Sequence, residues 1–295
     1  MGSIIGVDIG GTKIRLGVIS KTKKVLKDVT IPTKIPVYPY LENEIQKLLA
    51  EFPNVIGIGI GTRGMVDYER GIILYEKELE GWEGTEVKSQ LEAATKIRVE
   101  VNNDANCAAL AEAKLGAGKA FDHVICLTIG TCLGGGFVFD GKVMNGAHGG
   151  AGEVGHLILY PHGLQCGCGR KGCSEQYVSG TAIRRLIAEK RVIDPVTNAF
   201  VTPQQLFRLA ANGQRNAVEV RERFLTDLSF VISNLQAVLD IDCVVIGGGV
   251  SESANDWWDL LIEKVNPLKL QPLEIRRAIF GNESGMLGAA LLVQD

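Results

Sequence analysis

Three cysteines near the middle of the chain lie close enough together for their sulfur atoms to bind one metal ion. Cys166, Cys168 and Cys173 are separated largely by glycines, and His156 and His162 precede them. Thiolates at this spacing favour zinc, and glycines allow the tight backbone turns that direct several sulfur atoms at one ion. A closed tetrahedral site needs a fourth ligand, and either histidine could supply it. The segment therefore predicts a zinc site rather than a set of unrelated thiols.

A second group of candidate residues lies near the start of the chain, around the end of a β-branched run. It consists of Asp8, Gly10, Gly11, Thr12 and Lys13. Glycines let a phosphate approach the backbone, the threonine and the amides can donate hydrogen bonds, and the lysine adds positive charge. The aspartate could hold the Mg²⁺ that accompanies a nucleotide. The same residues would equally suit a plain hairpin turn. No helix follows them, which excludes a P-loop or a Rossmann fingerprint.

Two further glycine-rich turns follow predicted strands. Residues 128–136 are rich in glycine and threonine, and residues 247–249 are three consecutive glycines. The repeated Gly/Thr pattern favours two turns that grip one phosphate chain over two unrelated hairpins. Residues 59–64 fit the pattern G-X-G-X-X-G, but residues 65–71 lack helical periodicity. The dinucleotide-binding interpretation is therefore rejected.

A polar cluster, Asn102-Asn103-Asp104, lies at the junction between a predicted strand and a predicted helix. Asparagine and aspartate are common N-caps, so Asp104 could serve only to cap the helix. Three polar residues exceed what a cap requires, however, and an aspartate here could accept a proton from a substrate hydroxyl group. Asp104 is therefore the candidate general base.

The overall composition is that of an ordinary soluble protein. Of 295 residues, 46% are hydrophobic and 22% are charged, with a net charge of -3, so no basic face for nucleic acid is expected. The chain has no apolar run of about eighteen residues and no signal-peptide pattern, so we expect a cytoplasmic protein without membrane association. Four of the seven cysteines lie outside the zinc segment in apolar stretches, as reduced thiols do.

Alternating strand and helix patterns must position these residues. Strands are expected at residues 4–9, 14–19, 25–31, 55–62, 97–101, 124–130, 137–139 and 243–246. Helices are expected at residues 40–52, 102–116, 178–191, 201–209, 214–240, 257–265 and 285–292. The length suffices for two lobes, each with its own core.

Four motifs occur together in this chain: D-I-G-G-T-K at residues 8–13, N-N-D-A-N at 102–106, G-E-V-G-H at 152–156 and C-G-C-G-R-K-G-C-S-E at 166–175. Their order and spacing resemble those of the ROK family of sugar kinases (repressors, open reading frames, kinases), within the actin and hexokinase superfamily. The resemblance runs from Ile4 to about Leu292.

The resemblance implies an α/β, two-lobed, actin/hexokinase-like (ribonuclease H-like) fold with the active site in the interlobe cleft. It implies a small α/β lobe of residues 1–103, completed by the C-terminal helix at about 284–295. The large α/β lobe would comprise residues 104–283 and carry the zinc-binding loop.

The resemblance also implies a role for each candidate residue, with Asp104 as the catalytic base. Residues that match nucleotide- and phosphate-binding positions are Asp8, Gly10, Gly11, Thr12, Lys13, Thr131, Cys132, Gly134, Gly247, Gly248 and Gly249. Residues that match sugar-binding positions are Gly64, Asn103, Asp104, Glu153, His156 and Glu175. Zinc-ligand positions are matched by His156, Cys166, Cys168 and Cys173, which leaves His162 as a loop histidine.

The activity implied is that of an ATP-dependent hexose kinase in carbohydrate metabolism, acting in glycolysis as a glucokinase. It would phosphorylate the 6-hydroxyl group of glucose, with Mg²⁺ bound to ATP and a structural zinc ion. Mannose, N-acetylmannosamine and N-acetylglucosamine are alternative substrates. A non-catalytic sugar sensor or regulator is the alternative from another class. We do not expect a repressor, because the family's repressors carry a helix-turn-helix of several dozen residues before the first phosphate motif, and that motif begins here at residue 8. We expect a homo-oligomer, either a dimer or a tetramer.

Two positions depart from the family pattern. Cys132 stands where the second phosphate motif usually has glycine, and its side chain could crowd the nucleotide or expose a thiol to it. Arg63 stands where the family often has proline, and it could favour a sugar substituent beyond simple hydroxyl groups.

Overall fold

The computed structural model describes residues 2–294. The chain forms two compact units. Unit 1 comprises Met1–Lys119, Gly136–Gly152 and Phe280–Asp295, and unit 2 comprises Ala120–Gly135 and Glu153–Ile279. The predicted lobe limits, with a boundary between residues 103 and 104, stay a prediction. Within the described residues, no helix is both long and apolar enough to cross a membrane.

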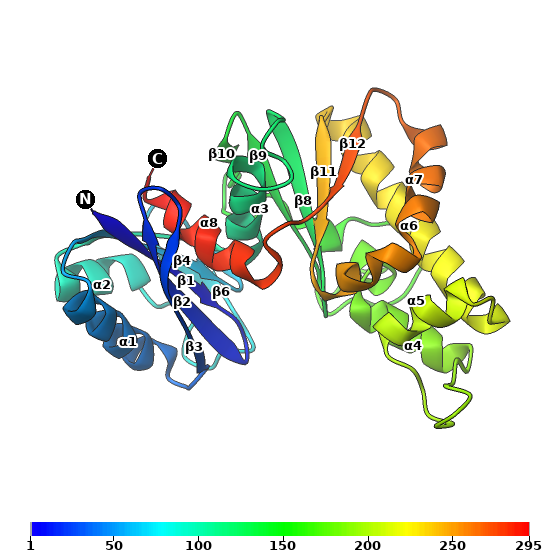
Figure 1. Cartoon of the computed structure of the whole chain (residues 1–295), viewed down its shortest axis with the longest axis horizontal. Helices are drawn as coiled ribbons and strands as arrows, with labels where there is room; N and C mark the ends of the chain where they lie inside the picture. The colour runs from blue at the N-terminus through cyan, green and yellow to red at the C-terminus, as the bar shows by residue number, and fades with distance from the viewer. Residues whose placement is uncertain (1, 295) are drawn as a thin grey trace. The chain divides into compact units, whose positions relative to one another are not determined.

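A five-stranded sheet forms the centre of unit 1 (Figure 1). In spatial order its strands are β3 (Val25–Pro32), β2 (Lys13–Ser20), β1 (Ser3–Ile9), β4 (Val55–Thr62) and β7 (Arg98–Asn103). β1 pairs antiparallel with β2, and both β1 and β7 pair in parallel with β4. The C-terminal ends of β1, β4 and β7 therefore meet at one edge of the sheet.

Unit 1 also contains helices and a small hairpin. The helices are α1 (Val37–Glu51), α2 (Val87–Thr95), α3 (Asp104–Lys114) and α8 (Ser284–Leu292), and the hairpin is formed by β5 (Met65–Asp67) and β6 (Ile72–Tyr75). α1 buries Leu41, Ile45 and Leu48, which recur on one helical face. α8 packs very closely against α3, because a Cβ atom at Gly288 would lie only 1.6 Å from the carbonyl oxygen of Cys107.

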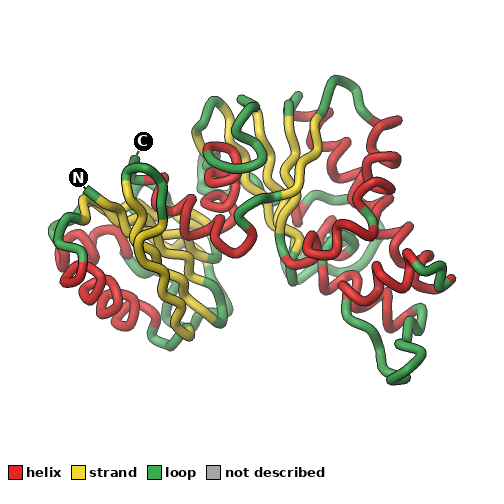
Figure 2. Tube along the Cα trace, in the orientation of Figure 1, coloured by secondary structure: helices red, strands yellow, loops and turns green. Residues whose placement is uncertain are grey.

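Unit 2 is built on three parallel strands of a second five-stranded sheet, coloured yellow in Figure 2. The order of that sheet is β10 (Lys142–Val143), β9 (Leu133–Phe139), β8 (His123–Ile129), β11 (Cys243–Gly247) and β12 (Glu274–Arg277). The helices of unit 2 are α4 (Gly180–Glu189), α5 (Pro203–Ala211), α6 (Arg215–Leu239) and α7 (Trp258–Val265). Phe207, Phe224 and Trp257 are buried together, with ring centroids 5.6 to 6.1 Å apart. These rings join α5 and α6 to the start of α7.

The predicted strands and helices are largely present, and the α/β fold class is confirmed. Two helix starts need correction. α1 begins at Val37 rather than Tyr40, because a proline is tolerated in the first turn of a helix. α3 begins at Asp104, because Asn102 and Asn103 still pair as the last residues of β7.

Candidate functional site

Parallel strands bring several predicted site residues to one edge of the unit 1 sheet. Asp8 of β1 lies opposite Gly61 of β4, and Thr62 of β4 lies opposite Asn103 of β7. The turn that contains the two predicted phosphate-binding glycines follows β1, and Asp104 follows β7. The first phosphate motif and the candidate base therefore share one edge of unit 1.

The phosphate turn, residues 10–13, is a short hairpin between β1 and β2. The amide of Gly10 donates to the carbonyl oxygen of Lys13 at 2.9 Å, and the hydroxyl group of Thr33 donates to the carbonyl oxygen of Gly10 at 2.8 Å. Gly11, Thr12 and Lys13 are exposed. Residues 10–13 therefore form the hairpin turn that the sequence also suggested. The same turn exposes the backbone, hydroxyl and ammonium groups that could bind a phosphate.

Asn103 caps α3 and also holds a neighbouring turn. Its Oδ1 accepts hydrogen bonds from the amides of Ala105 at 2.8 Å and Asn106 at 3.3 Å. Its Nδ2 donates to the carbonyl oxygen of Gly64 at 2.9 Å, and Gly64 has a φ angle of 89° that favours glycine. The helix cap is therefore Asn103, while Asp104 is the half-buried first residue of α3.

Further asparagine side chains support this junction. Asn102 Nδ2 donates to Asn145 Oδ1 at 2.8 Å, and Asn106 Nδ2 donates to Asn102 Oδ1 at 3.0 Å. The same Oδ1 accepts the amide of Asn103 at 2.8 Å. Sequence reasoning missed Asn145, whose only signal is its place in the glycine-rich segment before the G-E-V-G-H motif. The network links β7, α3 and the loop after β10.

The carboxyl group of Asp8 lies in a crowded, poorly solvated position. The pKa of Asp8 is raised from 3.8 to about 7, because burial and the negative charge of Asp104 raise it by more than Lys13 and Arg15 lower it. A Cβ atom at Gly285, near the start of α8, would lie 2.6 Å from the Asp8 carboxyl carbon. The start of α8 is thus one of the segments that shield the Asp8 carboxyl group from water.

The pKa of Asp104 is also raised, chiefly by burial. The amide of Ala105, which donates to Asp104 Oδ1 at 2.8 Å, and the positive charge of Arg63 lower that pKa, and Glu76 raises it. Arg63 is itself paired with Glu78, at 2.6 Å between Nη1 and Oε2. Both glutamates were missed by sequence reasoning, because only the fold brings the segment after β6 to this edge. A carboxylate with a raised pKa has the basicity that proton transfer requires.

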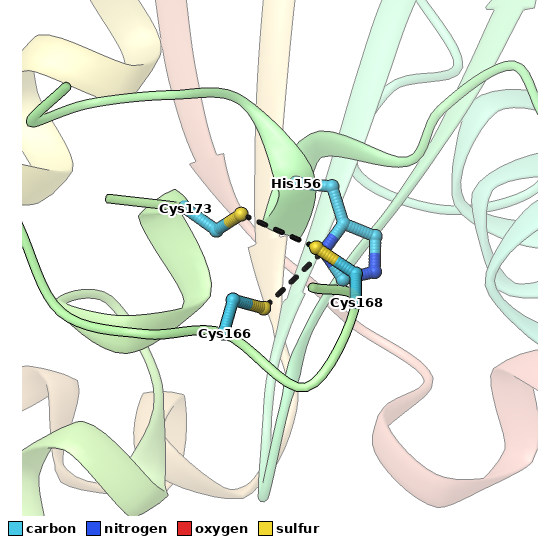
Figure 3. Close-up of side chains that lie close together, drawn as sticks. All are labelled: His156, Cys166, Cys168 and Cys173. Carbon is cyan, nitrogen blue, oxygen red and sulfur yellow. Dashed lines mark hydrogen bonds between the residues drawn. The ribbon is translucent and has the colours of Figure 1, made fainter. Parts of the chain in front are cut away.

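In unit 2, four potential metal ligands converge (Figure 3). The ligand atoms of His156, Cys166, Cys168 and Cys173 all lie within 4.8 Å of one another. The Cys168 and Cys173 sulfur atoms are 3.6 Å apart, which matches the roughly 3.8 Å expected for two thiolates about 2.3 Å from a tetrahedral zinc ion. The donor set therefore fits zinc, with His156 rather than the exposed His162 as its histidine.

The charges of the cluster also suit a cation. Hydrogen bonds from the backbone and the side chain of Arg170 lower the pKa of Cys168 to about 6, which favours the metal-binding thiolate. Burial and the neighbouring Cys168 and Cys166 raise the pKa of Cys173, and a bound cation would favour its ionised form.

The predicted sugar-binding residues of unit 2 lie beside this cluster. His156 presents Nδ1 to the Cys166 sulfur at 3.8 Å and has Nε2 4.0 Å from Glu153 Oε2. Glu175 follows Cys173 in the short 3-10 helix η2 (Ser174–Gln176), and a Cβ atom at Gly155 would lie 3.5 Å from the Cβ of Glu175. The structure therefore brings both glutamates and the histidine together.

The second and third glycine-rich turns of unit 2 meet at the ends of β8 and β11. A Cβ atom at Gly248, whose φ angle is 87°, would lie 2.6 Å from the amide nitrogen of Ile129. The carbonyl oxygen of Thr131 accepts a 2.8 Å hydrogen bond from the hydroxyl group of Thr181 at the start of α4. This end of the sheet carries the predicted nucleotide-binding residues Thr131, Cys132, Gly134, Gly247, Gly248 and Gly249.

Known proteins are similar to this chain over nearly its whole length. A sequence model of the ROK family matches residues 4–295. A glucokinase of Thermotoga maritima is 32% identical over 99% of this chain and 97% of its own. An N-acetyl-D-glucosamine kinase of Aliivibrio salmonicida is 34% identical over 97% of this chain and 98% of its own. A crystal structure of a ROK family glucokinase from Streptomyces griseus, in complex with glucose and AMPPNP, is 31% identical, covers 100% of both chains and has a TM-score of 0.81.

Proposed function

The chain belongs to the ROK family, and we propose that it transfers the γ-phosphoryl group of ATP to the 6-hydroxyl group of a hexose, with glucose as the preferred acceptor. It is an ATP-dependent sugar kinase, like the relatives to which it is similar. Beyond this activity, we propose which hydroxyl group is phosphorylated, which sugar is preferred and which residues take part.

The observation that carries the mechanism is the position of Asp104. Its carboxyl group is half-buried at the start of α3, and Asn103 satisfies the helix cap in its place. Burial raises its pKa, so the ionised form is a better proton acceptor than an exposed aspartate. Asp104 would accept the proton of the acceptor hydroxyl group as the new oxygen–phosphorus bond forms.

The phosphate turn would bind the transferring end of ATP. Its exposed amides, the Thr12 hydroxyl group and the Lys13 ammonium group can donate to phosphate oxygens. When Mg²⁺ is bound with ATP it neutralises charge on the phosphates, and Asp8 would hold it directly or through water. The turns at residues 131–134 and 247–249 match the family's other nucleotide-binding positions and would donate to the rest of the nucleotide.

Sugar orientation is assigned to hydrogen-bond acceptors and donors at the predicted sugar-binding positions. Glu153 and Glu175 would accept hydrogen bonds from ring hydroxyl groups, joined by His156 and Asn103. Zinc bound by the His156 cluster would be structural, because four protein ligands close a tetrahedral site and leave no position for substrate. It would hold the loop that carries His156 and Glu175.

A kinase assay with a panel of sugars tests the proposal. ADP release is measured with ATP and, separately, glucose, mannose, N-acetylmannosamine and N-acetylglucosamine. We expect the largest kcat/KM with glucose. N-acetylglucosamine is the second candidate, because the relative with that activity is as similar to this chain as the glucokinases are. Sugar binding without ADP release for every sugar would instead identify a sensor.

A further inference from the structure

Arg63 lies between two residues that are themselves held by hydrogen bonds. It follows β4, after Thr62, whose buried hydroxyl group accepts a hydrogen bond from the indole of Trp82 at 2.9 Å. It precedes Gly64, whose carbonyl oxygen is held by Asn103 at 2.9 Å. The backbone of Arg63 is therefore fixed on both sides.

Two carboxylates hold the guanidinium group. Nη1 pairs with Glu78 Oε2 at 2.6 Å, and Nε lies 3.8 Å from Glu76 Oε2. The Glu76 side chain is only 5% exposed, and its Oε1 accepts the amide of Glu78 at 2.7 Å. A guanidinium group has five N–H donors. The two recognised contacts, at Nη1 and Nε, orient the group and account for only part of this donor capacity.

The guanidinium group lies directly against the phosphate turn. A Cβ atom at Gly11 would be 2.7 Å from Arg63 Nη1, so glycine at that position is what admits the arginine. The positive charge of Arg63 also acts on Asp104, whose pKa it lowers. One cation therefore adjoins both the proposed γ-phosphate site and the proposed general base.

The neighbouring arginine cannot take this role. Arg15 is already paired with Asp28 and, at 3.0 Å, with Glu283, and its Nη1 donates to the carbonyl oxygen of Asn282 at 3.0 Å. Lys13 belongs to the phosphate turn itself, but a lysine offers a point charge without the planar fork that contacts two phosphoryl oxygens.

We propose that Arg63 donates hydrogen bonds to the γ-phosphoryl group of ATP and stabilises the charge that it carries during transfer. In this step the acceptor oxygen bonds to phosphorus, the bond from phosphorus to the β-phosphate oxygen breaks, and the hydroxyl proton passes to Asp104. Charge spreads over the equatorial phosphoryl oxygens, where a fixed planar cation stabilises it. The inference rests on the proposed kinase function and adds a residue that binds only the transferred group.

The test compares Arg63→Gln with Arg98→Gln, which removes an arginine from an exposed ion pair with Glu100 in the same unit. We expect Arg63→Gln to lower kcat about 100-fold, whereas Arg98→Gln leaves it within about twofold of wild type. Calorimetry with Mg²⁺ should show that Arg63→Gln weakens AMPPNP binding at least 10-fold relative to ADP binding, because only AMPPNP carries a γ-phosphoryl group. Sugar affinity should stay within about threefold. Arg63→Lys should recover part of the lost kcat.

Arg63→Gln activity within about threefold of Arg98→Gln would overturn the inference, as would an unchanged ratio of AMPPNP to ADP affinity. If Arg63→Gln does not fold, the same two measurements on Arg63→Lys decide, with a kcat and an affinity ratio equal to wild type counting against the inference. Absence of sugar-dependent ADP release from the wild-type protein would refute the proposed function itself, so the two failures are distinguishable.

Discussion

Replacement of Asp8 with asparagine should stabilise the ligand-free protein at neutral and alkaline pH. Burial and the negative charge of Asp104 raise the pKa of Asp8 from 3.8 to about 7. The folded state therefore keeps a proton on Asp8 in a pH range where the unfolded chain has lost it. The free energy of unfolding must then fall as the pH rises from about 4 to about 7. Asparagine has no proton to lose, so the variant avoids this decrease.

The size of the effect follows from the pKa shift. About three pKa units at about 1.4 kcal/mol each set a ceiling of about 4 kcal/mol at pH 8. Between pH 5 and pH 8 the free energy of unfolding should fall by the equivalent of about two of these pKa units, which is at most about 3 kcal/mol. At about 2 °C per kcal/mol for a chain of this size, the melting temperatures should diverge by up to about 6 °C.

Thermal unfolding of wild type and Asp8→Asn at pH 5 and pH 8, without ligands, measures this divergence. Asp28→Asn is the matched control, because Arg15 lowers the pKa of Asp28 and the loss of that carboxylate should destabilise the protein at pH 8. Addition of Mg²⁺ and ATP should raise the melting temperature of wild type more than that of Asp8→Asn, because the cation favours the ionised carboxylate. Parallel pH profiles of wild type and Asp8→Asn would mean that the pKa of Asp8 is not raised in the folded protein.

Two other substitutions test the zinc loop and the packing of α8. Cys168→Ser should reduce the bound zinc, measured by metal analysis, from about one ion per chain. It should also weaken sugar binding more than ATP binding. Equal losses of both affinities would instead indicate general unfolding. Gly288→Ala should lower the free energy of unfolding by about 3 kcal/mol in denaturant titrations, because the new methyl group would lie 1.6 Å from the carbonyl oxygen of Cys107. Gly130→Ala, where a Cβ atom has no neighbour within 4 Å, should change stability by less than about 1 kcal/mol, and equal losses in the two variants would contradict the packing argument.

Local patterns predicted the parts of this protein that depend on local chemistry. The β-branched runs at residues 4–9 and 243–246 form strands, and the long periodic segment at residues 214–240 forms a single helix, because each carries its own hydrophobic pattern. The three clustered cysteines likewise converge in space, since so few residues separate them. The predicted α/β fold matches that of the solved ROK family structures.

Features that depend on distant segments could not be read from the sequence. Residue spacing alone left His156 and His162 as alternative ligands; the family resemblance implied His156, and the folded loop places His156 beside the three cysteines. Glu76 reaches Arg63 because of how the segment after β6 returns to the sheet edge, and Asn145 reaches Asn102 through the loop after β10. Neither contact has a sequence spacing that predicts it. The raised pKa of Asp8 similarly depends on the packing of α8, which comes from the other end of the chain.

We propose that Asp104 is the general base of the phosphoryl transfer. Asp104→Asn keeps the size of the side chain and removes its ability to accept a proton, so the variant separates catalysis from folding and binding. With ATP and glucose, we predict that ADP release falls by about 100-fold to 10,000-fold, while glucose affinity measured by calorimetry stays within about threefold of wild type. Turnover of Asp104→Asn close to that of wild type would show that Asp104 is not the general base.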